Sequence, residues 1–153
     1  MTDLAAFPPL DLPEPADDDR SARAASLRSR RYTHAADGDS WVALFAEDGV
    51  VQDPVGPSPF DESGEGHRGH VAIRAFWDTV IAQNPVQLVI LLSNQSSDER
   101  EVANVIAITN TMPDGSTVST EMVACYRVDD DGKILSLRAY WEFAKLRFDP
   151  APA

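Results

Sequence analysis

The sequence predicts an α+β fold in which helices cover one face of a mostly antiparallel β-sheet. The first half of the chain carries helix-like patterns around one short strand-like segment, whereas the second half carries apolar, β-branched segments separated by turn signals. Helices that are separated along the chain from a run of strands are typical of α+β domains. With 153 residues, of which 43% are hydrophobic, the chain is long enough for one domain with a substantial core.

The N-terminal segment differs in composition from the rest of the chain. Residues 1–16 are rich in proline and show little periodic pattern, so we expect a flexible arm, on which Phe7 and Leu10 could dock on a neighbouring surface. The folded domain is expected over residues 17–148, and residues 149–153 form a short tail.

Two helices are predicted before the first strand. The aspartates at 17–19 suit a helix N-terminus, because carboxylates complement the exposed N–H groups there, and this helix should run to about Ala36. Asp39 or Ser40 should cap a second, short helix that includes Phe45.

A third helix is expected over residues 71–83, where apolar residues recur at helical spacing. Before it, Val50 and Val51 predict a short strand that ends in a rigid, proline-containing loop at Asp53 and Pro54. After it, apolar and β-branched residues predict four strands at residues 86–93, 101–112, 117–128 and 134–143.

Composition narrows the classes of partner. The formal net charge of -12 disfavours binding to nucleic acid or to an anionic membrane. Cys125 is the single cysteine, and with no secretion signal or long apolar run we expect a cytoplasmic protein. Acidic residues and histidines between 61 and 70 lie in a glycine-rich stretch, so we expect a solvated loop and no metal site.

Asp53 is the residue most suited to chemistry. It follows an apolar strand and precedes proline, which favours an extended backbone at that point. A carboxylate among apolar side chains is desolvated, which raises its pKa and makes it a candidate general base. The alternative is a turn aspartate that accepts backbone N–H bonds.

Tyr32 is the candidate partner of this base. It lies on the small-residue face of the first helix, either as a core tyrosine with its hydroxyl at the surface or as a hydrogen-bond donor into a cavity. A base and a donor that face one apolar cavity suit proton abstraction next to a carbonyl group.

Several segments together resemble a known family over about residues 22–148, in the same order. They are Arg31-Tyr32, Gly38-Asp39, Val42 to Asp48, Gln52 to Gly56, Ala72 to Phe76, Tyr126 to Asp129 and Arg138 to Trp141. The pattern is similar to that of the Δ5-3-ketosteroid isomerases, within the nuclear-transport-factor-2-like or SnoaL-like superfamily. The resemblance implies a cone-shaped curved sheet that, with three helices, encloses an apolar pocket, and it implies a homodimer.

The resemblance also implies roles for individual residues. Asp53 matches the catalytic base, Tyr32 the oxyanion donor, and Trp141 an aromatic in the pocket wall. Ala124 stands where the family has a protonated aspartic acid, its second oxyanion donor, and Met122 and Tyr126 share that strand face. Phe45 and Trp77 replace two tyrosines that support the oxyanion tyrosine in some members. These substitutions imply a more apolar substrate pocket.

Three functions follow from this interpretation. The first is a steroid Δ5-isomerase that needs no cofactor and acts on a 3-oxo-Δ5-steroid or another fused-ring ketone. The second is a polyketide cyclase with a single aspartate or an epoxide hydrolase, although Gln87 stands where paired-acid hydrolysis would need a carboxylate. The third is a carrier of hydrophobic small molecules that does no chemistry.

Overall fold

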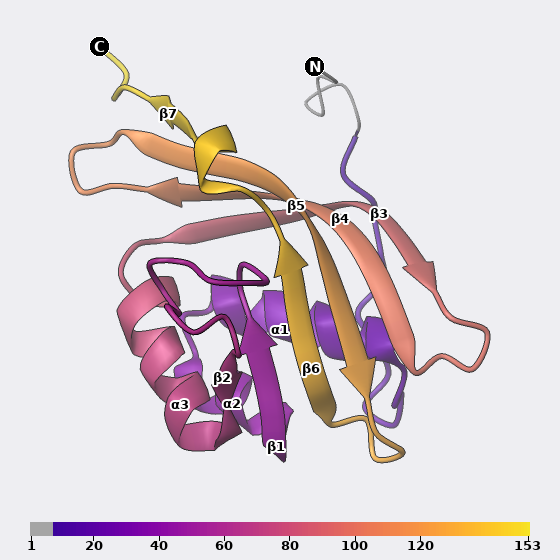
Figure 1. Cartoon of the computed structure of the whole chain (residues 1–153). Coiled ribbons are helices and arrows are strands. Elements are labelled where there is room, and N and C mark those ends of the chain that lie inside the picture. Colours follow the sequence, from indigo (N-terminus) through magenta and orange to yellow (C-terminus); the bar gives the residue numbers. More distant parts are fainter. Residues whose placement is uncertain (1–7) are drawn as a thin grey trace.

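The computed structural model describes residues 8–153 and confirms the predicted α+β class (Figure 1). The helices are α1 (Ala22–His34), α2 (Gly38–Ala43) and α3 (Gly69–Phe76), followed directly by a π-helical turn, η2 (Trp77–Ile81). The strands are β1 (Phe45–Gln52), β2 (His67–Arg68), β3 (Val86–Gln95), β4 (Glu101–Thr111), β5 (Thr117–Val128), β6 (Ile134–Tyr140) and β7 (Arg147–Asp149), with a short 3₁₀ turn, η3 (Phe143–Lys145), before β7.

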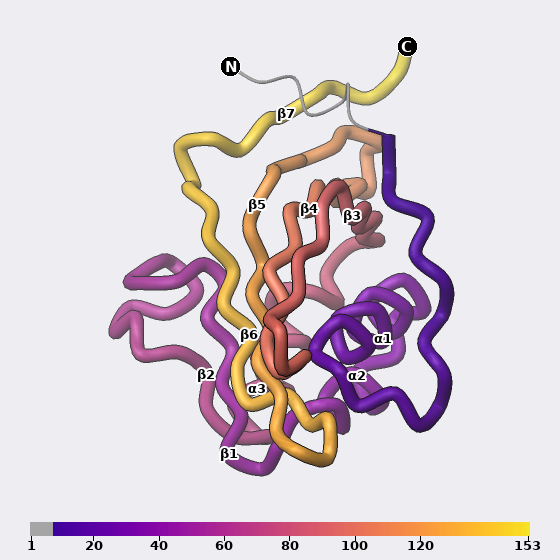
Figure 2. Tube along the Cα trace, turned by 90° about the vertical axis from the view of Figure 1, so that its right-hand side faces the viewer, coloured from indigo at the N-terminus to yellow at the C-terminus, as the bar shows by residue number. Residues whose placement is uncertain are grey.

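The sheet is open, curved and mostly antiparallel. Its strand order is β2-β1-β6-β5-β4-β3, with β7 paired to the start of β5. The pairing of β1 with β6 is parallel, whereas the other pairings are antiparallel. Figure 2 shows α1 and α2 together on one side of the strands. Because both helices lie against the same face, the sheet and the helices can enclose a cavity.

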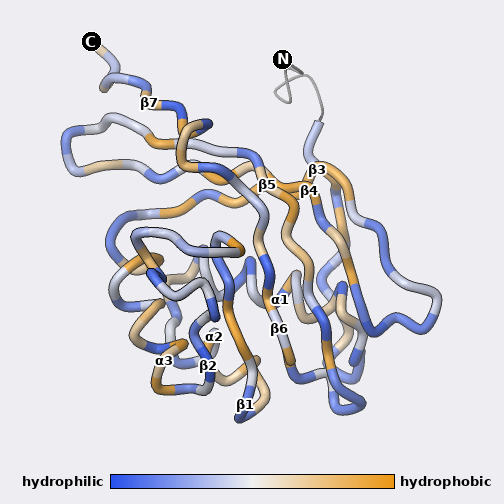
Figure 3. The backbone as a smooth tube through the Cα atoms, in the orientation of Figure 1, coloured by the Kyte–Doolittle hydropathy of each residue, from blue (hydrophilic) through white to orange (hydrophobic). Residues whose placement is uncertain are grey.

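The core lies between this face and the helices. Trp41, Phe45 and Phe76 are among the most deeply buried side chains, each 1% exposed. Figure 3 shows hydrophobic stretches within β1, β3 and α3, and hydrophilic residues at the turns between strands. Apolar burial on one face of the sheet and on the helices that cover it holds the two layers together.

The first two helices begin at other residues than expected. Ser21, rather than the aspartates at 17–19, caps α1, because its hydroxyl accepts from the amide of Ala24. Asp19 instead accepts from the amide of Ser21 and holds the cap residue in place. The cap of α2 is Asp37, which accepts from the amide of Ser40.

Phe45 is a strand residue and not part of the second helix. It pairs with Ile134 at the start of the parallel β1–β6 ladder, and the helix ends at Ala43. The third helix covers the expected region, but its last five residues, Trp77–Ile81, form a π-helical turn. The four strands expected in the second half agree with β3 to β6 within about three residues at each end.

The N-terminal arm is described from Pro8 onward, so the expected docking of Phe7 lies outside the described residues. Leu10 donates its amide to the carbonyl of Ile90 in β3, at 2.9 Å, and Leu12 packs against the core. Whether the arm is flexible stays a prediction. No helix within residues 8–153 is long and apolar enough to cross a membrane.

Candidate active site

A cavity of about 240 Å³ lies between the curved sheet and the helices. Its walls are mostly apolar and include side chains from the central strands, namely Ile106, Ile108, Met122, Leu137 and Ala139. This volume is near the lower end of the range for small-molecule sites, which are typically apolar with a few polar groups. The cavity therefore suits a compact hydrophobic ligand.

Asp53 lines this cavity directly after the end of β1. Val51, two residues earlier, is fully buried, and the amide of Val55 donates to the carbonyl of Ala139 in β6 at 2.8 Å. These contacts fix the chain on both sides of Asp53. Trp141 then donates from Nε1 to Asp53 Oδ1 at 2.6 Å.

The environment of the Asp53 carboxyl group raises its pKa. Burial is the largest cause, because an apolar surrounding penalises the charged form, while the hydrogen bond from Trp141 and the charge of His67 act in the opposite direction. The residue as a whole is partly exposed through the cavity, but its carboxyl group is desolvated. Within the described part of the chain, Asp53 is the one acid among the cavity-lining residues. This is the environment expected of a general base.

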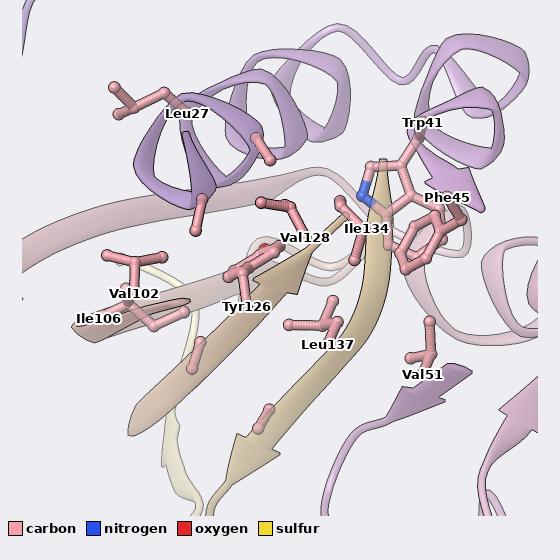
Figure 4. Packing of buried hydrophobic residues seen from close by; sticks show 14 of the residues in the cluster. Leu27, Trp41, Phe45, Val51, Val102, Ile106, Tyr126, Val128, Ile134 and Leu137 are labelled. Carbon is pink, nitrogen blue, oxygen red and sulfur yellow. The ribbon is translucent and has the colours of Figure 1, made fainter. Parts of the chain in front are cut away.

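Ser29, Trp41 and Tyr126, here called the serine cluster, are polar residues that line the same cavity. Trp41 donates from Nε1 to Ser29 Oγ at 2.9 Å, and the Tyr126 hydroxyl donates to the same oxygen at 3.0 Å. Both hydrogen bonds are buried. Figure 4 shows Trp41 from the helical layer facing the strands that carry Tyr126 and Leu137.

Tyr126 remains protonated under ordinary conditions. Burial, first, and the charge of Asp53 raise its pKa to about 12, although the hydrogen bond to Ser29 acts to lower it. Since the charge of Asp53 contributes, the two groups influence each other across the cavity. The arrangement therefore combines an acid that can act as a base with a neutral hydroxyl that can act as a donor.

Tyr32 occupies a different environment from the one expected. The cavity-lining residues in the described chain do not include it, although its neighbour on α1, Thr33, is among them. Its hydroxyl accepts a hydrogen bond from Arg31 Nη2 at 3.1 Å in an exposed position, and the Arg31 guanidinium lies over its ring. Tyr32 and Asp53 are thus not brought together around the cavity.

The other predicted binding residues divide into two groups. Met122, Ala124, Tyr126 and Trp141 line the cavity as expected. Phe45 and Trp77 lie instead in the core next to Trp41, with ring centroids 4.9 and 5.2 Å from that of Trp41. These two therefore support Trp41 by packing and are not among the cavity-lining residues of the described chain.

Most of the cavity lining was missed from the sequence, and two of the missed residues, Ser29 and Phe60, bear directly on the site. Ser29 lies one helical turn before Tyr32 on α1, so the predicted face of that helix is correct but the residue that reaches the cavity is different. Phe60, on the loop after Asp53, also lines the cavity. Its only sequence signal is a single aromatic residue within a proline-rich loop.

Asp61, one of the acidic residues of the loop, stabilises the loop through hydrogen bonds within it. Its carboxylate accepts from the Ser63 hydroxyl at 2.8 Å and from the amide of Gly66 at 2.7 Å. Within residues 8–153 no group of three or more His, Cys, Asp or Glu side chains is arranged as metal ligands. Cys125 is half-buried, and burial raises the pKa of its thiol.

An open α+β cone with one acid in an apolar cavity defines a class of small-molecule-binding domains. The model of the SnoaL-like domain family matches residues 29–137, and the chain belongs to this family. It is similar to RV0760c from Mycobacterium tuberculosis, with 33% identity, a TM-score of 0.81, and coverage of 88% of this chain and 99% of that one. It is also similar to a Δ5-3-ketosteroid isomerase from Mycobacterium sp., with 37% identity, a TM-score of 0.79, and coverage of 83% and 97%. RV0760c in complex with estradiol-17β-hemisuccinate matches with 35% identity, a TM-score of 0.79, and coverage of 83% and 98%.

Proposed function

We propose that this protein is a steroid Δ5-isomerase, which moves a proton within a 3-oxo-Δ5-steroid or a similar fused-ring ketone. The observation that carries the proposal is the desolvated carboxyl group of Asp53 in an apolar cavity that is also lined by the hydroxyl groups of Ser29 and Tyr126. The 37% identity to a Δ5-3-ketosteroid isomerase supports it.

The proposed reaction begins with Asp53. Its carboxylate removes a proton from the carbon next to the ketone, and the electrons of that C–H bond move into the carbonyl group to give a dienolate. The same carboxyl group then returns the proton to the γ carbon, so the double bond moves into conjugation and the enzyme is unchanged. The raised pKa favours the first step, because a carboxylate of ordinary pKa is a weak base.

The dienolate oxygen needs a hydrogen-bond donor, and the serine cluster is the favoured source. The Trp41 indole can only donate, so Ser29 must accept from it, and one proton lies between the hydroxyls of Ser29 and Tyr126. The cluster holds two hydroxyl protons, so one of them has no partner inside the cluster and can be donated to a ligand. Tyr126 is the stronger candidate, because a phenol is more acidic than an aliphatic alcohol; when Tyr126 donates to the ligand, Ser29 donates its own proton to Tyr126 and the hydrogen bond between them reverses.

A second candidate function is a carrier of hydrophobic small molecules. Ala124 favours it, because this buried cavity residue replaces the second oxyanion donor implied by the resemblance. Loss of one oxyanion donor typically lowers kcat by about 10²–10³-fold. Hydrolysis by paired acids is less favoured, since Asp53 has no second acid beside it among the described cavity residues.

The test follows conversion of a 3-oxo-Δ5-steroid to its conjugated isomer by ultraviolet absorbance. We expect conversion by the wild type, its loss in Asp53→Asn, and a decrease of about 10²-fold in Tyr126→Phe. Tyr32→Phe should remain close to the wild type. Steroid binding without conversion would refute the isomerase and leave the carrier, while a loss confined to Tyr32→Phe would return the donor role to Tyr32.

A further inference from the structure

The loop between Pro54 and Gly66 is held in a defined conformation by hydrogen bonds. The backbones of Ser58 and Asp61 exchange two hydrogen bonds, at 2.9 and 3.0 Å, and Gln52 donates from its side chain to the carbonyl of Gly64 at 3.2 Å. The Asp61 carboxylate closes the loop through the amide of Gly66. These contacts give the loop a defined position beside the end of β1.

The loop carries Phe60 into an aromatic cluster at the cavity. The ring centroid of Phe60 lies 6.3 Å from that of Trp141 and 5.5 Å from that of Phe143, and the last two are 4.6 Å apart. All three rings line the cavity together with Asp53. Phe60 is 38% exposed and Phe143 37% exposed, so these two form the solvent side of the cluster.

The cluster acts on Asp53 through Trp141. The indole Nε1 of Trp141 donates to Asp53 Oδ1 at 2.6 Å, and its ring is in contact with Phe60 and Phe143. Offset or tilted aromatic pairs at these distances are mutually stabilising, so the two phenylalanines restrict the orientation of the indole.

We propose that Phe60 is a positioning residue for Asp53: it holds the Trp141 ring that donates to the carboxylate, and it keeps water away from that carboxylate. This inference rests on the proposed role of Asp53 as a base, and it assigns a function to the long loop after β1. Phe60 does not need to touch the reacting atoms, because its effect passes through Trp141 and through hydration.

Two other titratable groups, on neighbouring elements, are linked to Asp53. His67, in β2, lowers the pKa of Asp53 through its charge, and Tyr126, in β5, lines the same cavity and has its own pKa raised in part by the charge of Asp53. Both remain unchanged in the variants below. A change in the titration of Asp53 can therefore be assigned to the aromatic cluster.

The experiment measures the titration of the Asp53 carboxyl carbon by NMR in the protein without ligand. Phe60→Ala should weaken both the hydrogen bond from Trp141, which lowers the pKa of Asp53, and the burial that raises it. We expect the pKa to fall toward its ordinary value, because burial is the larger of the two causes. Trp141→Phe should raise it further, because that variant keeps an aromatic ring but removes the hydrogen bond to the carboxylate. Phe60→Tyr should retain the wild-type titration.

Phe148→Ala is the matched control, since Phe148 is an exposed aromatic residue, 72% exposed, in β7. It should leave the titration of Asp53 unchanged. An Asp53 pKa that does not fall in Phe60→Ala, or that falls equally in Phe148→Ala, would overturn the proposal. Because the measurement needs no substrate, its result is independent of whether the protein isomerises steroids. In an active enzyme, the acidic limb of the pH profile of kcat/KM should move to lower pH in Phe60→Ala.

Discussion

The hydrogen bonds of Ser29 allow a quantitative test of the serine cluster. Ser29→Ala removes the oxygen that accepts from Trp41 Nε1 and from the Tyr126 hydroxyl. Trp41 also lines the cavity but is only 1% exposed, and its indole N–H is fixed in the ring plane and cannot rotate as a hydroxyl can, so the substitution leaves this donor without its partner. Tyr126 lines the cavity, so its hydroxyl can turn toward water there.

The expected cost follows from these two environments. A buried donor without a partner costs about 1–3 kcal/mol, and this applies fully to the Trp41 indole. Alanine is a better helix former than serine by roughly 0.5 kcal/mol, which offsets part of the loss at this position in α1. We therefore expect the free energy of unfolding to fall by about 0.5–2.5 kcal/mol.

Urea unfolding of four proteins measures this effect: the wild type, Ser29→Ala, Trp41→Phe and the double variant. In the Trp41→Phe background there is no indole N–H to leave unpaired, so Ser29→Ala should cost clearly less there. The difference between the two backgrounds is the coupling energy, expected at about 1 kcal/mol or more. Equal losses in both backgrounds would refute the hydrogen-bonded cluster.

Two further predictions concern stability. Because burial raises the pKa of Asp53, the folded state binds its proton more tightly than the unfolded state, and stability falls as the pH rises from the ordinary value through the raised one. Asp53→Asn should thus have a higher free energy of unfolding than the wild type at a pH above the raised pKa, and no such advantage at a pH below the ordinary pKa. Urea unfolding of both proteins at these two pH values measures this, and an equal difference in stability at both would contradict the prediction. Gly38→Ala should lower the free energy of unfolding by about 1–3 kcal/mol, since its Cβ would lie 2.8 and 2.9 Å from the Cδ1 and Cε2 atoms of the buried Trp77 ring. An unchanged or higher Tm for that variant would show that the ring can move aside.

The sequence predicted strands better than helix ends. Apolar and β-branched residues between turn signals located β3 to β6, because strand formation and burial leave a direct trace in the local composition. Helix starts depend instead on which of several polar side chains reaches a free amide. Near α1, the aspartates at 17–19 and Ser21 all qualify, and the structure assigns Ser21 as the cap. Phe45 was misassigned because its pairing with Ile134 joins residues far apart in the chain.

The candidate site was predictable only in part: its acid could be found from the sequence, but its hydrogen-bond donor could not. Asp53 could be found, because an aspartate between an apolar strand and a proline is visible in the sequence. The choice between Ser29 and Tyr32 could not be made, because it depends on how α1 is rotated against the sheet. Ser29 is 3% exposed in contact with Trp41 and Tyr126, whereas the hydroxyl of Tyr32 is at the surface. Helical periodicity defines a face, but it does not say how far along that face the cavity extends.

The register of the sheet explains why a cavity exists beside Asp53. Gln52 pairs with Arg138 and Ala139 pairs with Ala124, so Asp53 is level with two alanines on adjacent strands. Both alanines are buried and line the cavity, and their small side chains leave the space that larger residues would fill. Two residues further along these strands, Tyr126 pairs with Leu137, and Tyr126 brings its hydroxyl into the serine cluster. Ala124, which stands where the resemblance implies an oxyanion acid, thus also leaves space in the cavity beside Asp53. Under the proposed function, this one substitution both enlarges the apolar cavity and makes the serine cluster the source of the hydrogen-bond donor.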